Sequence, residues 1–163
     1  MSARVKFNHK WFTDLTMREL YALMVLRDDV FVVGQKITAE NELDGQDPQC
    51  VHIIGRLGVD EEGGGAGFDG KGRVVATARL FMAKDPVKVG RIAVAVDLQR
   101  KGVGTALMRY VHELLGGREG VMSAQQYLES WYAELGWQRV GDVYDEADIP
   151  HVRMVRPGSG VED

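Results

Sequence analysis

The sequence has little cysteine, no excess of positive charge and no long apolar run, and each shortage excludes a class of protein. A single cysteine, Cys50, can form no internal disulfide and supplies one thiol where a structural zinc site needs several. The net charge is -4, so the broad positive surface that binds nucleic acid is missing. No apolar stretch approaches a membrane span, and residues 1–10 lack the apolar block of a signal peptide. We expect a cytoplasmic protein that binds neither nucleic acid nor membranes.

The composition is typical of a globular protein. Of its residues, 45% are hydrophobic and 27% charged. A chain of 163 residues is long enough to bury one continuous core. We expect a single domain over residues 1–156 and a flexible tail over residues 157–163. The four histidines show neither the i, i+4 nor the alternating spacing of a metal site, so no metal is expected.

Local signals predict helices and strands that alternate only partly along the chain. A capping-box pair, Thr16 with Glu19, opens a helix over 16–29. A second such pair, Ser123 with Gln126, would open a helix that ends at Gly136. A third helix is expected over 104–115, an extended segment over 30–33, and strands over residues 51–59, 73–81, 87–96, 121–123, 137–143 and 151–155. The pattern indicates an α/β or α+β domain with a mixed sheet.

The most informative segment is a bend between the strand at 87–96 and the following helix. Gly102 and Gly104 occupy this bend, where unpaired N–H groups of a first helical turn attract anions. Glycine allows phosphate oxygens to approach, and Arg100 and Lys101 add positive charge. A P-loop would need lysine before Thr105, and the third glycine of a Rossmann fingerprint is absent. Spacing alone leaves phosphate binding and a plain strand–helix turn equally favoured.

The segment 99–104, Gln-Arg-Lys-Gly-Val-Gly, resembles motif A of the GCN5-related N-acetyltransferases (GNAT). The likeness to the ElaA-like branch extends over residues 11–154 and is carried by Leu26-Arg27, 30–33, Gln35, 42–44, His52, Ser123-Ala124, 132–137 and 149–154. The resemblance implies a twisted mixed sheet of six to seven strands, flanked by about four helices and splayed between its fourth and fifth strands.

The resemblance also implies that acetyl-CoA lies in the splayed opening. Its pantetheine arm would pair with strand backbone near Val94 and Val96. Its diphosphate would contact the turn formed by Gln99, Arg100, Lys101, Gly102, Val103, Gly104 and Thr105. An amide of Val94, or of a neighbour in a local bulge, would polarise the thioester carbonyl.

The family places a tyrosine at Tyr132, with its hydroxyl towards the CoA sulfur. A phenol titrates near 10 and a thiol near 8.5, so full proton transfer is uphill by about 2 kcal/mol, and a hydrogen bond to the leaving thiolate is the safer assignment. The spacing of Tyr132 with Leu128, Trp131 and Leu135 equally suits a core residue.

The resemblance also implies that the acidic loop with Glu40, Glu42, Asp44 and Asp47 lies near the acceptor. Glu42 and Asp44 are the candidate general bases, because Gly34 stands where relatives often carry glutamate; a solvated acidic loop is the alternative. Arg27, His52 and His151 are candidate acceptor-binding residues, although each taken alone better fits a hydrogen-bonded structural residue than a catalyst.

We therefore expect an acetyl-CoA-dependent N-acetyltransferase that acetylates the amine of a small molecule or peptide by direct attack on the thioester. A non-catalytic acyl-CoA-binding or sensing module is the alternative, and a nucleotide-binding protein is disfavoured. Oligomeric state stays open, with a homodimer as one option.

Overall fold

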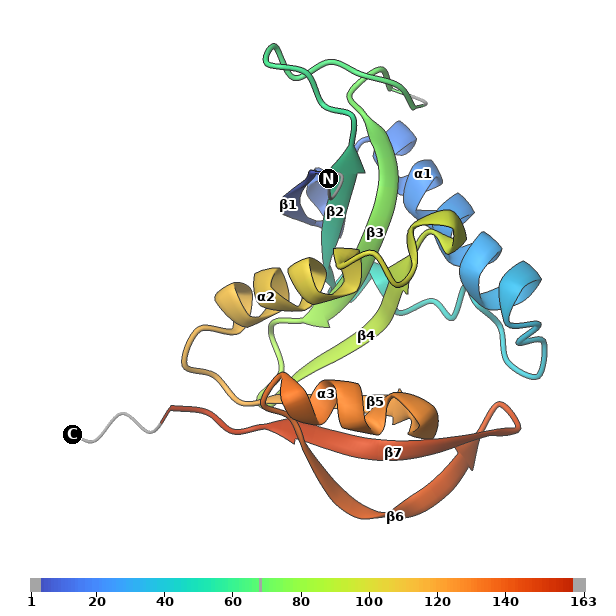
Figure 1. Ribbon diagram of the computed structural model, residues 1–163, viewed down its shortest axis with the longest axis vertical. Helices are drawn as coiled ribbons and strands as arrows, with labels where there is room; N and C mark the ends of the chain where they lie inside the picture. The colour runs from blue at the N-terminus through green and yellow to red at the C-terminus, as the bar shows by residue number, and fades with distance from the viewer. Residues whose placement is uncertain (1–3, 68, 160–163) are drawn as a thin grey trace.

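The structure is a computed structural model that describes residues 4–67 and 69–159. Within these residues, seven strands form one mixed sheet in the order β1-β2-β3-β4-β5-β7-β6 (Figure 1). The strands are β1 (Val5–Trp11), β2 (Val51–Leu57), β3 (Arg73–Phe81), β4 (Val87–Val94), β5 (Gly120–Gln125), β6 (Gln138–Glu146) and β7 (Ile149–Arg156). The predicted mixed sheet is confirmed.

The sheet is splayed between β4 and β5. These two strands run parallel and pair at Val87 with Gly120 and at Lys88 with Val121, whereas the other neighbouring strands are antiparallel over most of their length. Beyond Lys88 the strands diverge, which leaves one edge of β4 open. The predicted splay between the fourth and fifth strands is confirmed.

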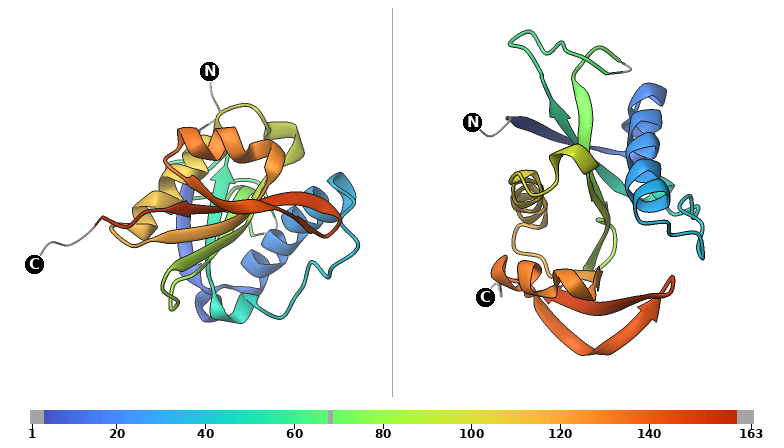
Figure 2. Two further views of the ribbon diagram at one scale, coloured as in Figure 1. Left: turned by 90° about the horizontal axis from the view of Figure 1, so that it is seen from below. Right: turned by 45° about the vertical axis from the view of Figure 1, so that its right-hand side comes forward.

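Three α-helices occur in the described part of the chain: α1 (Met17–Arg27), α2 (Val103–Leu115) and α3 (Glu129–Glu134). In Figure 2 (right), α1 and α2 cover opposite faces of the sheet formed by β2, β3 and β4. The capping box that opens α1 is present, since Glu19 N–H donates to Thr16 Oγ1 (3.1 Å) and Thr16 N–H donates to Glu19 Oε1 (2.9 Å). The expectation of about four helices is met only if the π-helical continuation of α1 is counted.

That continuation corrects the extended segment predicted over 30–33. Asp28–Gly34 forms a π-helix because Val30 is buried in the core beside Leu26, and tertiary packing outweighs the β propensity of the valines. A Cβ on Gly34 would lie 2.9 Å from the carbonyl oxygen of Asp29. The wide π turn therefore suits glycine at this position.

The second predicted capping box is absent. Ser123 lies within β5 opposite Arg153 of β7, and no side chain caps α3 or the 3₁₀ turn Gln126–Leu128 before it. Strand pairing with β7 extends β5 to Gln125 and so takes up the serine that local spacing assigned to a helix.

Strand β1 was not predicted from the sequence. It pairs with β2 from Val5 to Trp11, and its mostly polar residues give only a weak alternating pattern, as is usual for an edge strand.

At the other end of the chain, Ser159 N–H donates to the carbonyl of Gly117 (3.1 Å). Residues 160–163 of the predicted tail lie outside the described residues. None of the described helices has the length and apolar character needed to cross a bilayer.

Candidate active site

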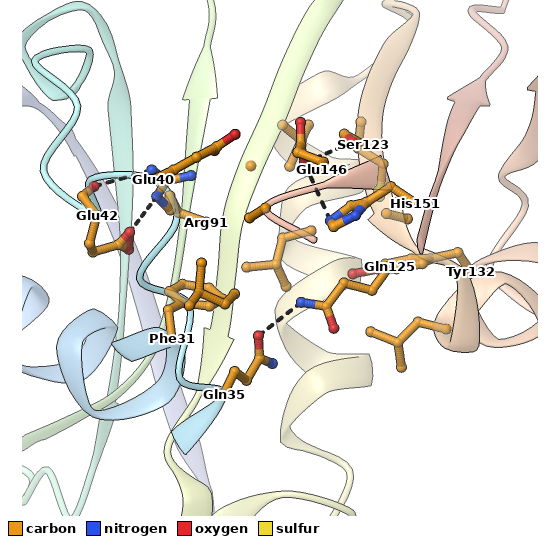
Figure 3. A pocket seen from close by; sticks show the side chains of 18 of the residues that line it. Phe31, Gln35, Glu40, Glu42, Arg91, Ser123, Gln125, Tyr132, Glu146 and His151 are labelled. Carbon is orange, nitrogen blue, oxygen red and sulfur yellow. Dashed lines mark hydrogen bonds and ion pairs between the residues drawn. The ribbon is translucent and has the colours of Figure 1, made fainter. Parts of the chain in front are cut away.

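Two adjoining cavities occupy the splay. The central cavity is bounded by β4, β5, the π-helical segment, the loop that follows it and the start of β7 (Figure 3). The bend groove runs beside it to the N-terminus of α2. Residues that line both are Gln35, Ile92, Leu128 and Tyr132. The two cavities therefore meet at these four residues, and Tyr132 is the one among them with an ionisable side chain.

The bend groove ends at the first turn of α2. Gly102 caps this helix with φ +86°, and no side chain caps its amides. A Cβ on Gly102 would meet no atom within 4 Å. Gln99, Arg100, Gly102, Gly104 and Thr105 line the groove. An uncapped helix N-terminus that opens on a groove with an arginine beside it suits an anionic group such as a diphosphate.

The remaining predicted CoA-binding residues are divided between different surroundings. Lys101 is exposed, whereas Val103 is buried in the core. Val94 lines the bend groove, and its carbonyl accepts a hydrogen bond from Gln99 Nε2 (3.1 Å). Strand β4 ends at Val94, so the predicted strand over 87–96 is two residues too long. Val96 starts a 3₁₀ turn, is 60% exposed and lines a different groove, against α1.

A β-bulge in β4 faces the central cavity. Thr77 pairs with Ala93 and Arg79 with Gly90, which leaves Arg91 and Ile92 opposite a single residue of β3. Arg91 adopts φ +49°, a conformation that costs a non-glycine residue about 1–2 kcal/mol. Its Nε lies 2.7 Å from Glu42 Oε2. The bulge thus turns the backbone at the cavity wall and attaches the acidic loop to it.

Arginine–carboxylate pairs hold the acidic loop on the sheet. Arg27 is 1% exposed and contacts Glu42 Oε1 through Nε (3.2 Å) and Asp47 Oδ1 through Nη1 (2.7 Å). Arg79 Nη1 donates to Asp44 Oδ1 (2.9 Å) and to Asp47 Oδ1 (3.1 Å). We refer to Arg27, Arg79, Arg91, Glu42, Asp44 and Asp47 as the loop network.

The loop network shifts the pKa values of Glu42 and Asp44, the two carboxylates predicted to be general bases. Burial raises the pKa of Glu42, against the opposing charges of Arg27 and Arg91. Hydrogen bonds from Arg79 hold the pKa of Asp44 well below its usual range. Glu42 lines the central cavity, whereas Asp44 does not.

Two of the predicted acceptor-binding residues lie away from the cavity. Arg27 and His52 are both 1% exposed, and neither lines the central cavity. His52 Nε2 lies 3.0 Å from the carbonyl oxygen of Asp47, and burial lowers the pKa of the imidazole. Both residues hold the acidic loop in place through buried contacts, Arg27 with Glu42 and Asp47 and His52 with the backbone of Asp47. His151, by contrast, lines the central cavity.

Tyr132 extends from α3 into the wall shared by the two cavities (Figure 3). It is 4% exposed and its ring lies 4.8 Å from that of Trp131. Burial, with a smaller contribution from Tyr127, raises the pKa of the phenol above its usual range, so the hydroxyl is protonated at neutral pH. No hydrogen-bond partner for this hydroxyl is found among residues 4–67 and 69–159, and its proton is available to a ligand in the cavity.

The comparisons with known proteins agree with this geometry. The model of the Acetyltransferase (GNAT) domain matches residues 66–156. The chain belongs to this acetyltransferase family. It is 33% identical to Protein ElaA of Escherichia coli, over 88% of this chain and 91% of that protein, and 33% identical to a UPF0039 protein of Schizosaccharomyces pombe, over 93% and 97% of the two chains.

Solved structures of GNAT relatives show the same fold. The crystal structure of an acyl-CoA N-acyltransferase from Pseudomonas aeruginosa has a TM-score of 0.76 and 32% identity, and the match covers 94% of this chain and 99% of that one. The crystal structure of E. coli ElaA has a TM-score of 0.77, 29% identity and the same coverage. The resemblance to GNAT proteins and to ElaA is confirmed, and the protein is an acyltransferase by family.

Several residues of the candidate site were not predicted from the sequence. Arg79 and Arg91 had a usable signal, because an arginine inside an apolar strand requires a buried carboxylate partner. Gln125 and Glu146 had none. They lie at the ends of β5 and β6 and meet the cavity only through the order in which these strands pair with β7.

Proposed function

We propose that the protein transfers an acetyl group from acetyl-CoA to the amine of a small molecule or peptide by direct attack on the thioester. The observation that carries the proposal is the junction of the bend groove and the central cavity at Tyr132. A donor lying in the groove would bring its thioester to this junction, and an acceptor in the central cavity would reach it from the other side.

The residues that line the bend groove can be assigned to parts of the CoA donor. Amides of the Gln99–Thr105 turn would hold the diphosphate, and Arg100 would add charge. The open edge of β4 offers backbone groups to the pantetheine arm. The carbonyl of Val94 is bound by Gln99 Nε2, so the Gln99 side chain must turn away before a ligand amide can use this acceptor.

Tyr132 is proposed to donate a hydrogen bond to the departing sulfur. Its raised pKa opposes complete proton transfer, which agrees with stabilisation of the thiolate rather than full acid catalysis. The amides of the Gly90–Ile92 bulge, at the wall of the same cavity, are proposed to polarise the thioester carbonyl.

Glu42 and Asp44 are better assigned to positioning than to proton transfer. Both oxygens of Glu42 are bound, one by Arg27 and one by Arg91, and Asp44 is hydrogen-bonded to Arg79. Hydrogen bonds from Arg79 lower the pKa of Asp44 and so weaken it as a proton acceptor. Burial raises the pKa of Glu42, but ion pairs with Arg27 and Arg91 occupy both of its oxygens.

Release of free thiol from acetyl-CoA in the presence of pooled amines, amino acids and peptides tests the proposal. We expect turnover that depends on both the amine and acetyl-CoA. Tight CoA binding in isothermal titration calorimetry, without thiol release from any pool, would instead support the acyl-CoA-sensing alternative.

A further inference from the structure

A chain of hydrogen bonds on the β5-β7-β6 part of the sheet ends at the central cavity. Ser123 Oγ donates to Glu146 Oε2 (3.1 Å) and contacts the hydroxyl of Tyr144. Glu146 Oε2 lies 3.3 Å from His151 Nε2. Because the single proton of Ser123 is directed to the carboxylate, the Tyr144 hydroxyl must be the donor to Ser123. The chain therefore runs from Tyr144 through Ser123 to Glu146 and His151.

The proton positions on His151 follow from its partners. Nδ1 lies 2.6 Å from the carbonyl oxygen of Ile149, and a carbonyl can only accept, so Nδ1 carries a proton. In the neutral ring Nε2 then has no proton and can only accept a hydrogen bond. It faces the Glu146 carboxylate, which is also only an acceptor when ionised. These two atoms can approach to 3.3 Å favourably only with a proton between them or with a donor from a ligand beside them.

The pair is accessible from the same cavity as Tyr132. Ser123, Glu146 and His151 all line it, on the side opposite Glu42 and Arg91 (Figure 3). The Glu146 side chain is 42% exposed, whereas that of His151 is 8% exposed. A ligand in the cavity can thus reach the carboxylate while the imidazole stays held by its neighbours.

Several other polar groups at the cavity are already engaged. Gln125 Nε2 donates to Gln35 Oε1 (2.8 Å), and Arg91 is paired with Glu42 and Asp44. Tyr132 carries its own proton. Glu146 has no arginine or lysine partner among the described residues, in contrast to Glu42 and Asp44. Of Glu42, Asp44 and Glu146, only Glu146 lacks a guanidinium partner within the part of the chain that the structure describes.

We infer that Glu146 and His151 together take the proton from the acceptor amine, and that the site selects amines that arrive as ammonium ions. This inference rests on the proposed acetyl transfer. An R–NH3+ group would supply the missing donor between Glu146 Oε2 and His151 Nε2 and would lose one proton to that pair. Ser123 and Tyr144 are positioning residues that orient the carboxylate.

The transfer balances with this assignment. The neutral R–NH2 attacks the thioester carbonyl, a C–N bond forms and the C–S bond breaks. Of the two protons that the ammonium loses, one goes to the Glu146–His151 pair and on to water, and the other ends on the CoA thiol. Ser123 is not a nucleophile in this transfer, because the amine attacks the thioester directly; its hydroxyl orients the carboxylate by donating to Glu146 Oε2.

Amines of different basicity test the inference. Glu146→Gln and His151→Gln should each reduce kcat/KM for an alkylamine at neutral pH about 10²- to 10⁴-fold, with an unchanged Kd for CoA. The loss should be far smaller for a hydrazide or an aromatic amine, which is already neutral. Asp145→Asn is the matched control, since this residue neighbours Glu146 on β6 but does not line the cavity, and it should retain full activity.

Equal losses for both kinds of amine, or unchanged kinetics in Glu146→Gln, would overturn the inference and leave acetyl transfer standing. Absence of thiol release from the wild-type protein would refute acetyl transfer and, with it, the proton transfer. The ¹⁵N spectrum of the His151 ring decides the geometry independently. We expect a protonated Nδ1 and an Nε2 resonance that moves in Glu146→Gln but not in Asp145→Asn; an unprotonated Nδ1 would remove the pair.

Discussion

Gln125 Nε2 donates a 2.8 Å hydrogen bond to Gln35 Oε1 across the gap between the two halves of the sheet (Figure 3). Gln125 ends β5, and Gln35 directly follows the π-helical segment that continues α1. The bond therefore depends on the helical path of residues 28–34, since an extended chain there would carry Gln35 elsewhere.

A double-mutant cycle can measure this bond. Gln35→Ala and Gln125→Ala should each lower the free energy of unfolding, and the double variant should lose less than the sum by about 0.5–1.5 kcal/mol. Urea denaturation of the four proteins provides the values. Strict additivity would show that the two amides do not stabilise each other in solution.

Gly102→Ala should weaken CoA binding. The added Cβ would project into open space at the bend, at φ +86°, and would obstruct a phosphate group there. Loss of one charge-assisted hydrogen bond, about 1.5–3 kcal/mol, raises Kd at least about tenfold. Gly116→Ala is the control, because Gly116 also has positive φ and open space around it but lies at the other end of α2.

Calorimetry of both glycine variants separates strain from ligand contact. Both should lose stability, Gly116→Ala at least as much because its φ of +56° and ψ of -125° lie outside the left-handed helical region, yet only Gly102→Ala should lose affinity for CoA. Equal affinities would mean that the diphosphate binds elsewhere than at the N-terminus of α2.

Tyr132→Phe should bind CoA with wild-type affinity and lose about 10²-fold in kcat, the scale of one hydrogen bond to developing charge. The substitution removes only the hydroxyl, so the packing of the ring against Trp131 is kept. Tyr21→Phe, at a 61% exposed residue of α1, should leave kcat unchanged. Steady-state thiol release measures both, and an active Tyr132→Phe enzyme would exclude the proposed role.

Arg27→Ala should destabilise the fold by about 3–5 kcal/mol, since it removes a buried guanidinium that contacts both Glu42 and Asp47 and leaves these carboxylates to Arg91 and Arg79 alone. Arg139→Ala breaks the pair with Glu129, whose side chains are 35% and 32% exposed, and should cost less than about 1 kcal/mol. Chemical denaturation compares the two. Similar losses would contradict a special role for the loop network.

The loop network also predicts a dependence of stability on acid. Burial raises the pKa of Asp47, but its hydrogen bonds and the charges of Arg27 and Arg79 outweigh this, and the pKa is lowered overall; that of Asp44 is lowered as well. The unfolded chain then binds more protons, so the free energy of unfolding falls as the pH drops from about 4 through the folded pKa values. Asp47→Asn should flatten this fall in denaturation curves between pH 2.5 and 5, and an unchanged slope would exclude Asp47 as a source.

Local signals in the sequence were sufficient where a few neighbouring residues decide the structure. The Thr16–Glu19 capping box and the Gly102 bend are of this kind, because side chain and backbone meet within one turn. The π-helical path of residues 28–34 was not predictable, since the burial of Val30 decides it. The pair of Glu146 with His151 depends on the register of β6 with β7, which no short-range pattern encodes.

The short pairing between β4 and β5 predicts that a bound donor stabilises the protein. Two residue pairs join β4 to β5 within the described chain, so backbone pairing attaches β5, β7 and β6 to β4 at one end only, and at the other end the Gln125–Gln35 hydrogen bond crosses the gap. A molecule bound along the unpaired edge of β4 would contact both parts of the sheet, β1–β4 and β5-β7-β6, and would hold them together. Melting temperature should accordingly rise with donor concentration, and amide protons of β5 should exchange more slowly once the gap is filled.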